Sequence, residues 1–199
     1  AAPVGELRWK EPQPVKNWSD VRKCETFGPN AMQGKPVPFG VYTAEFLIPV
    51  DEPIEEDCLY LNVWTGSQSV KEKRPVIVYI HGGAFMSGSG SVPIYDGDAI
   101  ARKGIVFVTI NYRLGIFGFF SHPELTKESP HHASGNQGIL DQVAALKWIK
   151  KNIASFGGDP NNVTIAGQSA GAMSVNILDA SPLGRGLFEK MIAESGANV

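Results

Sequence analysis

The feature that most constrains the fold of this chain is the segment VTIAGQSAGA at residues 163–172. Its β-branched start suits a buried strand, and its small residues from Ala170 onward suit a helix. Ser169 then lies in the sharp turn between them, where the backbone is strained. Gly167 and Gly171 lack the Cβ atoms that would keep neighbouring backbone away from so tight a turn. The segment therefore predicts a strand, a turn and a helix, with the Ser169 hydroxyl exposed beside the amides at the helix N-terminus.

The pentapeptide GQSAG within this segment matches the G-x-S-x-G pattern of a nucleophile elbow. By itself the pattern is weak evidence, since Gly, Ser and Ala are common and a turn of small residues is often purely structural. The strand before it and the helix after it are the context that an elbow requires. Ser169 is therefore the candidate nucleophile, and Gly167 and Gly171 are candidate structural residues.

Strand and helix patterns alternate along most of the chain, which predicts an α/β fold with a mostly parallel sheet and crossover helices. Strands are expected at residues 58–64, 76–80, 105–111, 163–166 and 190–194, and helices at residues 95–103, 136–156 and after Ser169. The run at 76–80 is apolar throughout, as in a central strand covered on both faces. Residues 112–135 contain two prolines and are expected to form a long surface loop.

The chain divides near residue 56 into two regions of one domain. Residues 1–56 are rich in Pro, Gly and aromatic side chains and predict an irregular coat with short strands. Residues 57–199 are expected to carry the central sheet. HGGAF at residues 81–85 lies at the C-terminal end of a predicted strand, the edge where open α/β sheets bind ligands. The Ser/Gly run that continues it lacks the Lys and the spacing of a phosphate-binding loop, so we assign it to the same site.

Composition excludes several classes of partner. Hydrophobic residues make up 43% and charged residues 19% of the 199 residues, as in a globular protein with a substantial core. The net charge of −2 provides no basic surface for nucleic acid, and no apolar run is long enough for a membrane span. The expected ligand is therefore a small molecule. The chain begins without Met, so a signal peptide is not observable; a secreted or periplasmic location is compatible with the sequence, which does not determine it.

Neither the cysteines nor the histidines indicate a metal or cofactor site. Cys24 and Cys58 are too few for a disulfide scaffold, and a disulfide and two free thiols are both open. The pair His131-His132 lacks metal-ligand spacing, which favours a solvated loop over zinc. His81 adjoins the glycine-rich loop, where a histidine that shapes the site is favoured over a catalytic base.

Five ordered motifs resemble the type-B carboxylesterase (cholinesterase-like) family, in particular its bacterial para-nitrobenzyl-esterase-like members. They are EDCLYLNVW at 56–64, HGGAF at 81–85, NYRLGIFGF at 111–119, GNQGILDQVAALKWIKKNIASFGGDP at 135–160 and GQSAG at 167–171. The resemblance implies an α/β-hydrolase fold that is incomplete at the C-terminus, because the chain is similar to the N-terminal part of the family only.

The resemblance implies a serine carboxylic-ester hydrolase that acts through an acyl-enzyme on Ser169, without a metal or cofactor. It assigns the oxyanion hole to Gly82, Gly83, Ala84 and Ala170, with Gly82 providing close approach of bare backbone. In α/β-hydrolases the triad follows the order serine, acid, histidine, whereas all four histidines here precede Ser169. The acid and the histidine are therefore expected beyond Val199, and residues 1–199 alone are expected to lack substantial turnover.

The resemblance further suggests two structural ion pairs, Arg8 with Glu56 and Arg113 with Asp141; solvated surface charges are the alternative. The family often bridges a Cys that follows its F-G-P segment to the Cys of EDCLYLN, but here Cys24 lies upstream of that segment. A Cys24–Cys58 disulfide is therefore only a hypothesis.

Two other functions are compatible with the same motifs. One is a non-catalytic, cholinesterase-like adhesion or binding domain, and the other is a different α/β-hydrolase reaction such as lactone or amide cleavage.

An uncovered sheet edge is also expected, so the missing C-terminal part of the same domain is a candidate partner.

Overall fold

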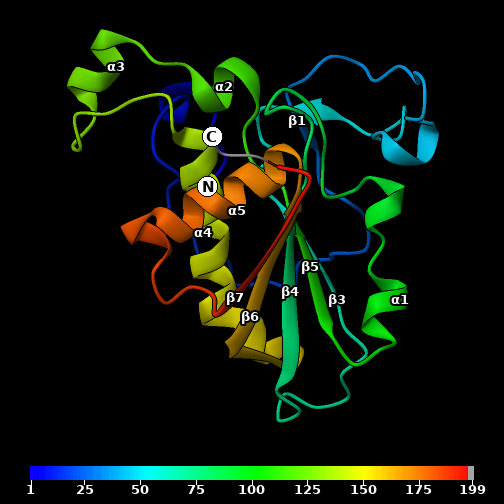
Figure 1. Ribbon diagram of the computed structural model, residues 1–199. Helices are drawn as coiled ribbons and strands as arrows, with labels where there is room; N and C mark the ends of the chain where they lie inside the picture. The colour runs from blue at the N-terminus through cyan, green and yellow to red at the C-terminus, as the bar shows by residue number, and fades with distance from the viewer. Residues whose placement is uncertain (197–199) are drawn as a thin grey trace.

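The centre of the computed structural model, which describes residues 1–196, is a five-stranded sheet (Figure 1). Its strands are β3 (Leu61–Trp64), β4 (Arg74–Ile80), β5 (Val106–Ile110), β6 (Gly158–Gln168) and β7 (Lys190–Glu194), in the order β3-β5-β4-β6-β7. Strands β4 to β7 are parallel to their neighbours, and only β3 runs antiparallel, against β5. This confirms the predicted α/β fold with a mostly parallel sheet.

Helices cover the two faces of the sheet unequally. The long helices α4 (Gln137–Asn152) and α5 (Ala170–Ala180) lie on one face, and the short α1 (Asp98–Ala101) lies on the other (Figure 1). A 3₁₀ turn, η4 (Ile153–Phe156), continues α4 until Gly157, whose φ of 76° ends it in the left-handed conformation. The predicted helix at 136–156 is therefore α4 followed by η4.

Two predictions of local structure are wrong. Residues 112–135 contain two helices, α2 (Gly115–Phe119) and α3 (Pro123–Glu128), in place of a continuous loop. Pro123 starts α3, because a proline in the first helical turn loses no hydrogen bond, and His122 caps the helix by accepting from the Glu124 N–H. The helix expected at 95–103 is reduced to α1, preceded by the 3₁₀ turn η3 (Pro93–Tyr95).

The core lies between the sheet and helices α4 and α5. The side chains of Val76, Val78 and Ile80 on β4 are fully buried, and every residue of β5 is buried. Ile77 and Tyr79 on the other face of β4 are only half-buried. The expectation that this strand is covered on both faces therefore holds for one face, since the four residues of α1 cover little of the other.

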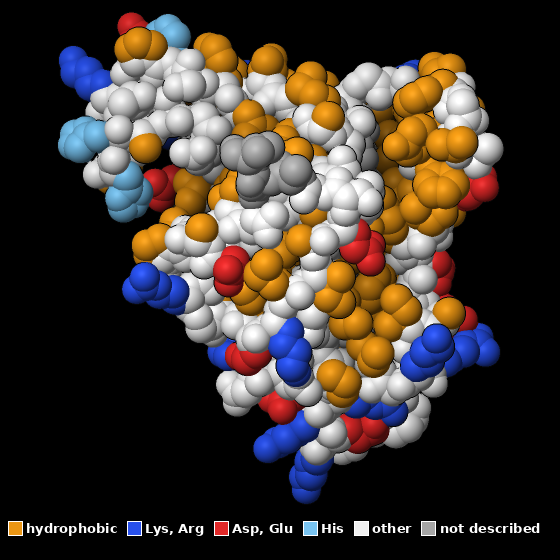
Figure 2. Space-filling view, viewed as in Figure 1, with side chains coloured by type: hydrophobic (Ala, Val, Ile, Leu, Met, Phe, Trp, Pro, Cys, Tyr) orange, Lys and Arg blue, Asp and Glu red, His pale blue; other side chains and the backbone are white. Residues whose placement is uncertain are grey.

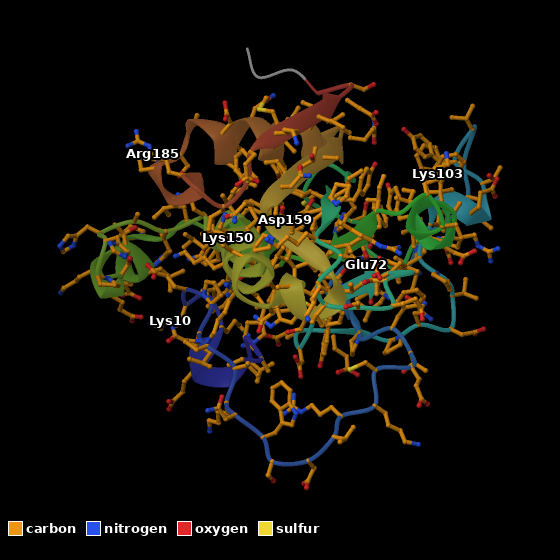
Figure 3. All side chains as sticks on the ribbon, turned by 90° about the horizontal axis from the view of Figure 1, so that it is seen from below. Lys10, Glu72, Lys103, Lys150, Asp159 and Arg185 are labelled. Carbon is orange, nitrogen blue, oxygen red and sulfur yellow. The ribbon has the colours of Figure 1, made fainter. Side chains whose placement is uncertain are left out.

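The N-terminal region contains one pair of very short parallel strands, β1 (Asn30–Ala31) and β2 (Ile54–Glu55), and the 3₁₀ turns η1 (Gly5–Leu7) and η2 (Ala44–Phe46). Residues 13–27 are all exposed and form an arm that loops away from the body (Figure 3). Hydrophobic side chains gather on the lobe that carries η2 (Figure 2). The exposed side chains of this region include Val37, Phe39 and Val41. The division of the domain near residue 56 stays a prediction.

The sheet has an open edge at β7, all five residues of which are exposed. Both cysteines are free: Cys24 is exposed on the arm, while Cys58 is buried and its pKa is raised to about 12 by that burial. Of the two options that the sequence left open, the structure has the free thiols. Over residues 1–196, no helix combines the length and the apolar character that a membrane span requires.

Candidate active site

Ser169 occupies the turn between β6 and α5 in a strained conformation. Its backbone angles, φ of 56° and ψ of −121°, lie in a region that residues other than glycine rarely adopt, at a cost of about 1–3 kcal/mol. Its N–H donates to the carbonyl oxygen of Glu194 on β7 at 2.9 Å, and its carbonyl oxygen accepts from the Met173 N–H at 3.0 Å. The elbow is thus tied to β7 on one side and to α5 on the other.

Two glycines allow the elbow to pack against the end of β4. A Cβ on Gly171 would overlap the carbonyl oxygen of Ile80, and a Cβ on Gly167 would overlap the Gly171 carbonyl group. No flexible side chain can relieve either overlap, because both involve backbone atoms. Any larger residue at these positions would therefore push the turn away from β4.

The HGGAF loop lies directly against the elbow. A Cβ on Gly82 would be 2.7 Å from the Gln168 carbonyl oxygen and 3.2 Å from the Ser169 Cβ. The three residues that follow, Gly83, Ala84 and Phe85, all have positive φ, of 103°, 55° and 59°. This run of left-handed residues turns the chain sharply beside Ser169.

Three backbone N–H groups near Ser169 are available as donors. In the part of the chain that the structure describes, the N–H groups of Gly83 and Ala84 donate no hydrogen bond, and both residues are exposed. Ala170 is the first residue of α5, so its N–H has no acceptor within the helix. Donors of this kind can stabilise a negatively charged oxygen, helped by the positive end of the α5 dipole.

His81 braces the loop from beneath. It is buried and donates from Nδ1 to the Gly82 carbonyl oxygen at 2.8 Å. Its ring stacks on Tyr112 at a centroid distance of 4.5 Å, and the Tyr112 hydroxyl donates to the His81 carbonyl oxygen at 3.0 Å. Burial lowers the pKa of His81 to about 4, so the ring is neutral near pH 7. The ring therefore holds the loop, and it forms no hydrogen bond with Ser169.

The burial of His81 predicts acid sensitivity. Its folded pKa of about 4 lies below its unfolded value of 6.5, so the unfolded chain binds the proton first as the pH falls. The contribution is constant above pH 6.5 and destabilises the fold progressively from pH 6.5 down to about 4. His81→Asn keeps a donor near Nδ1 and does not titrate. In urea unfolding of the full-length protein at pH 6.5 and 4.5, wild type should lose about 2 kcal/mol more stability than this variant. Equal losses would contradict the prediction.

The other three histidines lie away from the elbow. His122 caps α3. At the surface, the His131 Nε2 lies 3.5 Å from the Glu11 Oε1. Within residues 1–196, none of His122, His131 and His132 forms a hydrogen bond with Ser169. Glu189 is also engaged elsewhere, since its Oε2 accepts from the Val163 N–H at 2.7 Å. Among the described residues, no group of three or more His, Cys, Asp or Glu side chains is arranged to hold a metal ion.

Two ion pairs connect the segments around the site. Arg113, three residues after β5, pairs with Asp141 of α4 through two side-chain bonds of 2.8 and 2.7 Å, and its backbone N–H also donates to Asp141 at 3.1 Å. Both side chains are buried, at 3% and 0% exposure. Arg8 pairs with Glu56 at 2.5 and 2.6 Å but is partly exposed. Loss of one partner would therefore destabilise the fold far more in the buried Arg113–Asp141 pair than in the partly exposed Arg8–Glu56 pair.

Several contacts at the site have no signal in the sequence. No motif predicts that the Glu194 carbonyl oxygen accepts from the Ser169 N–H. Tyr112 lies within NYRLGIFGF, but that motif does not reveal that its hydroxyl donates to the His81 carbonyl oxygen. A buried polar network joins the N-terminal coat to the segment after HGGAF, and its side chains belong to Asn30, Glu52, Ser89, Ser91 and Asn111. The N-terminal coat shows no periodicity, so the sequence does not predict this polar network.

The fold and the elbow together define an α/β-hydrolase. The sequence matches the Carboxylesterase family over residues 1–199, and the chain belongs to that family. This confirms the predicted resemblance. The fumonisin B1 esterase of Sphingopyxis macrogoltabida is 47% identical over 195 residues, which cover 98% of this chain and 35% of that protein. The para-nitrobenzyl esterase of Bacillus subtilis is 47% identical over 98% of this chain and 38% of its own length.

A solved structure agrees with this assignment. The carboxylesterase EST55 of Geobacillus stearothermophilus superposes with a TM-score of 0.83 and 47% identity, over 96% of this chain and 37% of that one. The chain thus spans little more than a third of the length of these relatives.

Proposed function

We propose that this chain is the nucleophile-bearing part of a serine carboxylesterase that hydrolyses small-molecule carboxylic esters. The observation that carries the proposal is the strained backbone of Ser169 beside the Gly83 and Ala84 N–H groups, which donate no hydrogen bond among the described residues. A strained residue persists only where its surroundings hold it, and such residues cluster at functional sites. The esterase names of the relatives support the same chemistry.

In the proposed reaction the Ser169 Oγ attacks the ester carbonyl carbon and gives up its proton to a general base. The carbonyl oxygen becomes an oxyanion, for which the N–H groups of Gly83, Ala84 and Ala170 are the donors. Each donor is worth about 3 kcal/mol of transition-state stabilisation. The C–O bond then breaks, the alcohol leaves with a proton, and water cleaves the acyl-enzyme to release the acid and restore Ser169.

The base is supplied by chain beyond Val199 in this proposal, together with the acid that orients it. No histidine within residues 1–196 hydrogen-bonds to Ser169, and His81 is committed to the Gly82 carbonyl. The open edge at β7 supports association with that further chain, because unpaired strand edges invite pairing. The gap between this chain and the length of its relatives is consistent with such a segment.

The intact elbow favours this proposal over a non-catalytic adhesion domain, since binding does not require a strained serine beside free donors. Lactone and amide cleavage use the same groups and are distinguished only by substrate. The full-length protein is expected to hydrolyse short p-nitrophenyl esters and to be labelled at Ser169 by a fluorophosphonate. Folded protein that does neither would contradict the proposal, and preference for a lactone or an amide would change the substrate class.

Residues 1–199 alone are expected to show no Ser169-dependent turnover, because the nucleophile has no base to take its proton. Purified residues 1–199 and the full-length protein should be compared with the same p-nitrophenyl ester at equal concentration, with circular dichroism to confirm folding. Robust hydrolysis by the short chain that disappears in its Ser169→Ala variant would show that the base lies within it.

A further inference from the structure

The loop at residues 83–88 holds a conformation that its own contacts do little to stabilise. Three successive residues have positive φ, and the loop's internal backbone bonds are two, from the Met86 and Ser87 N–H groups to the Gly83 carbonyl oxygen. Strained backbone of this kind needs neighbours that over-determine it. The residues that hold this loop therefore decide where the Gly83 and Ala84 N–H groups point.

Gln33, in the N-terminal coat, grips the far end of this loop with both ends of its side-chain amide. Its Nε2 donates to the Gly88 carbonyl oxygen at 2.9 Å, and its Oε1 accepts from the Gly88 N–H at 2.9 Å. The Nε2 group also donates to the Ala31 carbonyl oxygen at 3.1 Å. Two bonds from one planar amide restrain both the position and the orientation of Gly88, which a single bond would not do.

Gly88 transmits that position to the site. It has a φ of 107°, and a Cβ there would be 2.5 Å from the His81 Nδ1 and 2.8 Å from the Gly82 carbonyl oxygen. Gly88 therefore packs on the hydrogen bond that joins His81 to Gly82. Gly82 in turn packs on Ser169. A displaced Gly88 would disturb the loop immediately before the proposed donors.

The coat that carries Gln33 is itself anchored beside the loop. β1 lies at the upper end of the sheet, where β4 ends (Figure 1). Asn30 is fully buried and donates from Nδ2 to the Glu52 carboxylate at 2.8 Å. The Ser91 Oγ donates to the same carboxylate at 2.5 Å and lies 3.1 Å from the Asn30 Oδ1. The same short stretch of coat thus holds the chain at Gly88 and again at Ser91.

We propose that Gln33 is a positioning residue for ester hydrolysis: its amide holds Gly88, and through it the loop that presents the Gly83 and Ala84 N–H groups to the oxyanion. The inference rests on the proposed function. It assigns a role in the chemistry to the N-terminal coat, which touches no reacting atom. Gln33 would stabilise the transition state indirectly, by limiting the orientations that the loop samples.

The test is Gln33→Met in the full-length protein, since methionine fills similar space and forms neither bond. The matched control is Gln13→Met on the exposed arm, where the side-chain amide donates to the Glu11 carbonyl oxygen two residues away. We expect kcat for a p-nitrophenyl ester to fall about 10-fold to 100-fold, with KM within about twofold, because the loss is confined to oxyanion stabilisation. The inhibition constant of a trifluoromethyl ketone, whose adduct with serine carries an oxyanion, should rise by a similar factor.

Two further measurements keep the outcome decisive. Hydrogen exchange of the peptide covering residues 82–90 should be faster in Gln33→Met than in wild type and in Gln13→Met. Gln33→Glu, which keeps the acceptor for the Gly88 N–H and places a carboxylate oxygen against its carbonyl, should lose at least as much kcat. An active wild type whose Gln33 variants retain its kcat, inhibitor affinity and exchange overturns the inference. A wild type without turnover contradicts the proposed function instead, and exchange still reports whether Gln33 holds the loop.

Discussion

Ser169→Ala in the full-length protein is expected to lower kcat for ester hydrolysis by about 10⁵-fold to 10⁶-fold. In the proposed mechanism the substitution removes the atom that forms the acyl bond, while the proposed oxyanion donors stay in place. Residual turnover would then come from water activated in the same site. Fluorophosphonate labelling should disappear altogether, because no nucleophile remains to form the adduct. The measurements are initial rates with a p-nitrophenyl ester and the mass of the labelled peptide.

The control is Ser19→Ala on the exposed arm, which should match wild type in rate and labelling. A second variant, Ser169→Gly, tests the strain separately. Glycine adopts a φ of 56° without a Cβ penalty, so this variant should be more stable than Ser169→Ala by about 1 kcal/mol. Retention of wild-type rates in both Ser169 variants would remove Ser169 from the mechanism, and equal stability of the two would argue against a strained turn.

Asp141→Asn is expected to lower the free energy of unfolding by about 3–5 kcal/mol. The change leaves the Arg113 guanidinium buried without its counter-charge, at a position where it is only 3% exposed. It also weakens three hydrogen bonds that join the segment after β5 to α4. The full-length protein should therefore unfold at a lower urea concentration. The measurement is equilibrium unfolding followed by fluorescence.

Two comparisons isolate the cause. Asp98→Asn breaks an exposed pair with Arg102 four residues along the chain, and should cost no more than about 0.5 kcal/mol. The double variant Arg113→Met with Asp141→Leu removes both charges together and should recover most of the loss, because no uncompensated charge stays buried. If Asp141→Asn behaves like Asp98→Asn, the buried pair contributes little to stability.

The sequence predicted the central elements of the fold well. β7 was predicted at its observed bounds. The helix α4 with η4 was located to within a residue, because its helical pattern is strong and Gly157 marks its end. The errors came from reading Pro123 as a loop residue and from reading β4 as a fully covered strand. The sequence around Pro123 does not reveal the bond by which His122 caps α3. The sequence of β4 does not reveal how short the helix that covers it is.

At the candidate site the sequence could name the residues that carry their own local signal. Ser169 and the glycines around it form a compact motif, since the geometry of a tight turn dictates small residues at fixed spacing. HGGAF was identified because it follows a strand at the ligand-binding edge of a sheet. The sequence alone therefore determined the fold class, the family resemblance and the candidate nucleophile.

Only the tertiary structure decided what surrounds that nucleophile. The packing of Gly82 on Ser169, the bond of His81 to the loop and the grip of Gln33 on Gly88 join segments that are distant in the chain. Such contacts depend on how the sheet brings strand ends together, and a half-buried glutamine in an irregular coat has no periodicity that would reveal its partner. Local patterns report the conformation of a segment, whereas the orientation of a backbone N–H group is set by whatever packs against it.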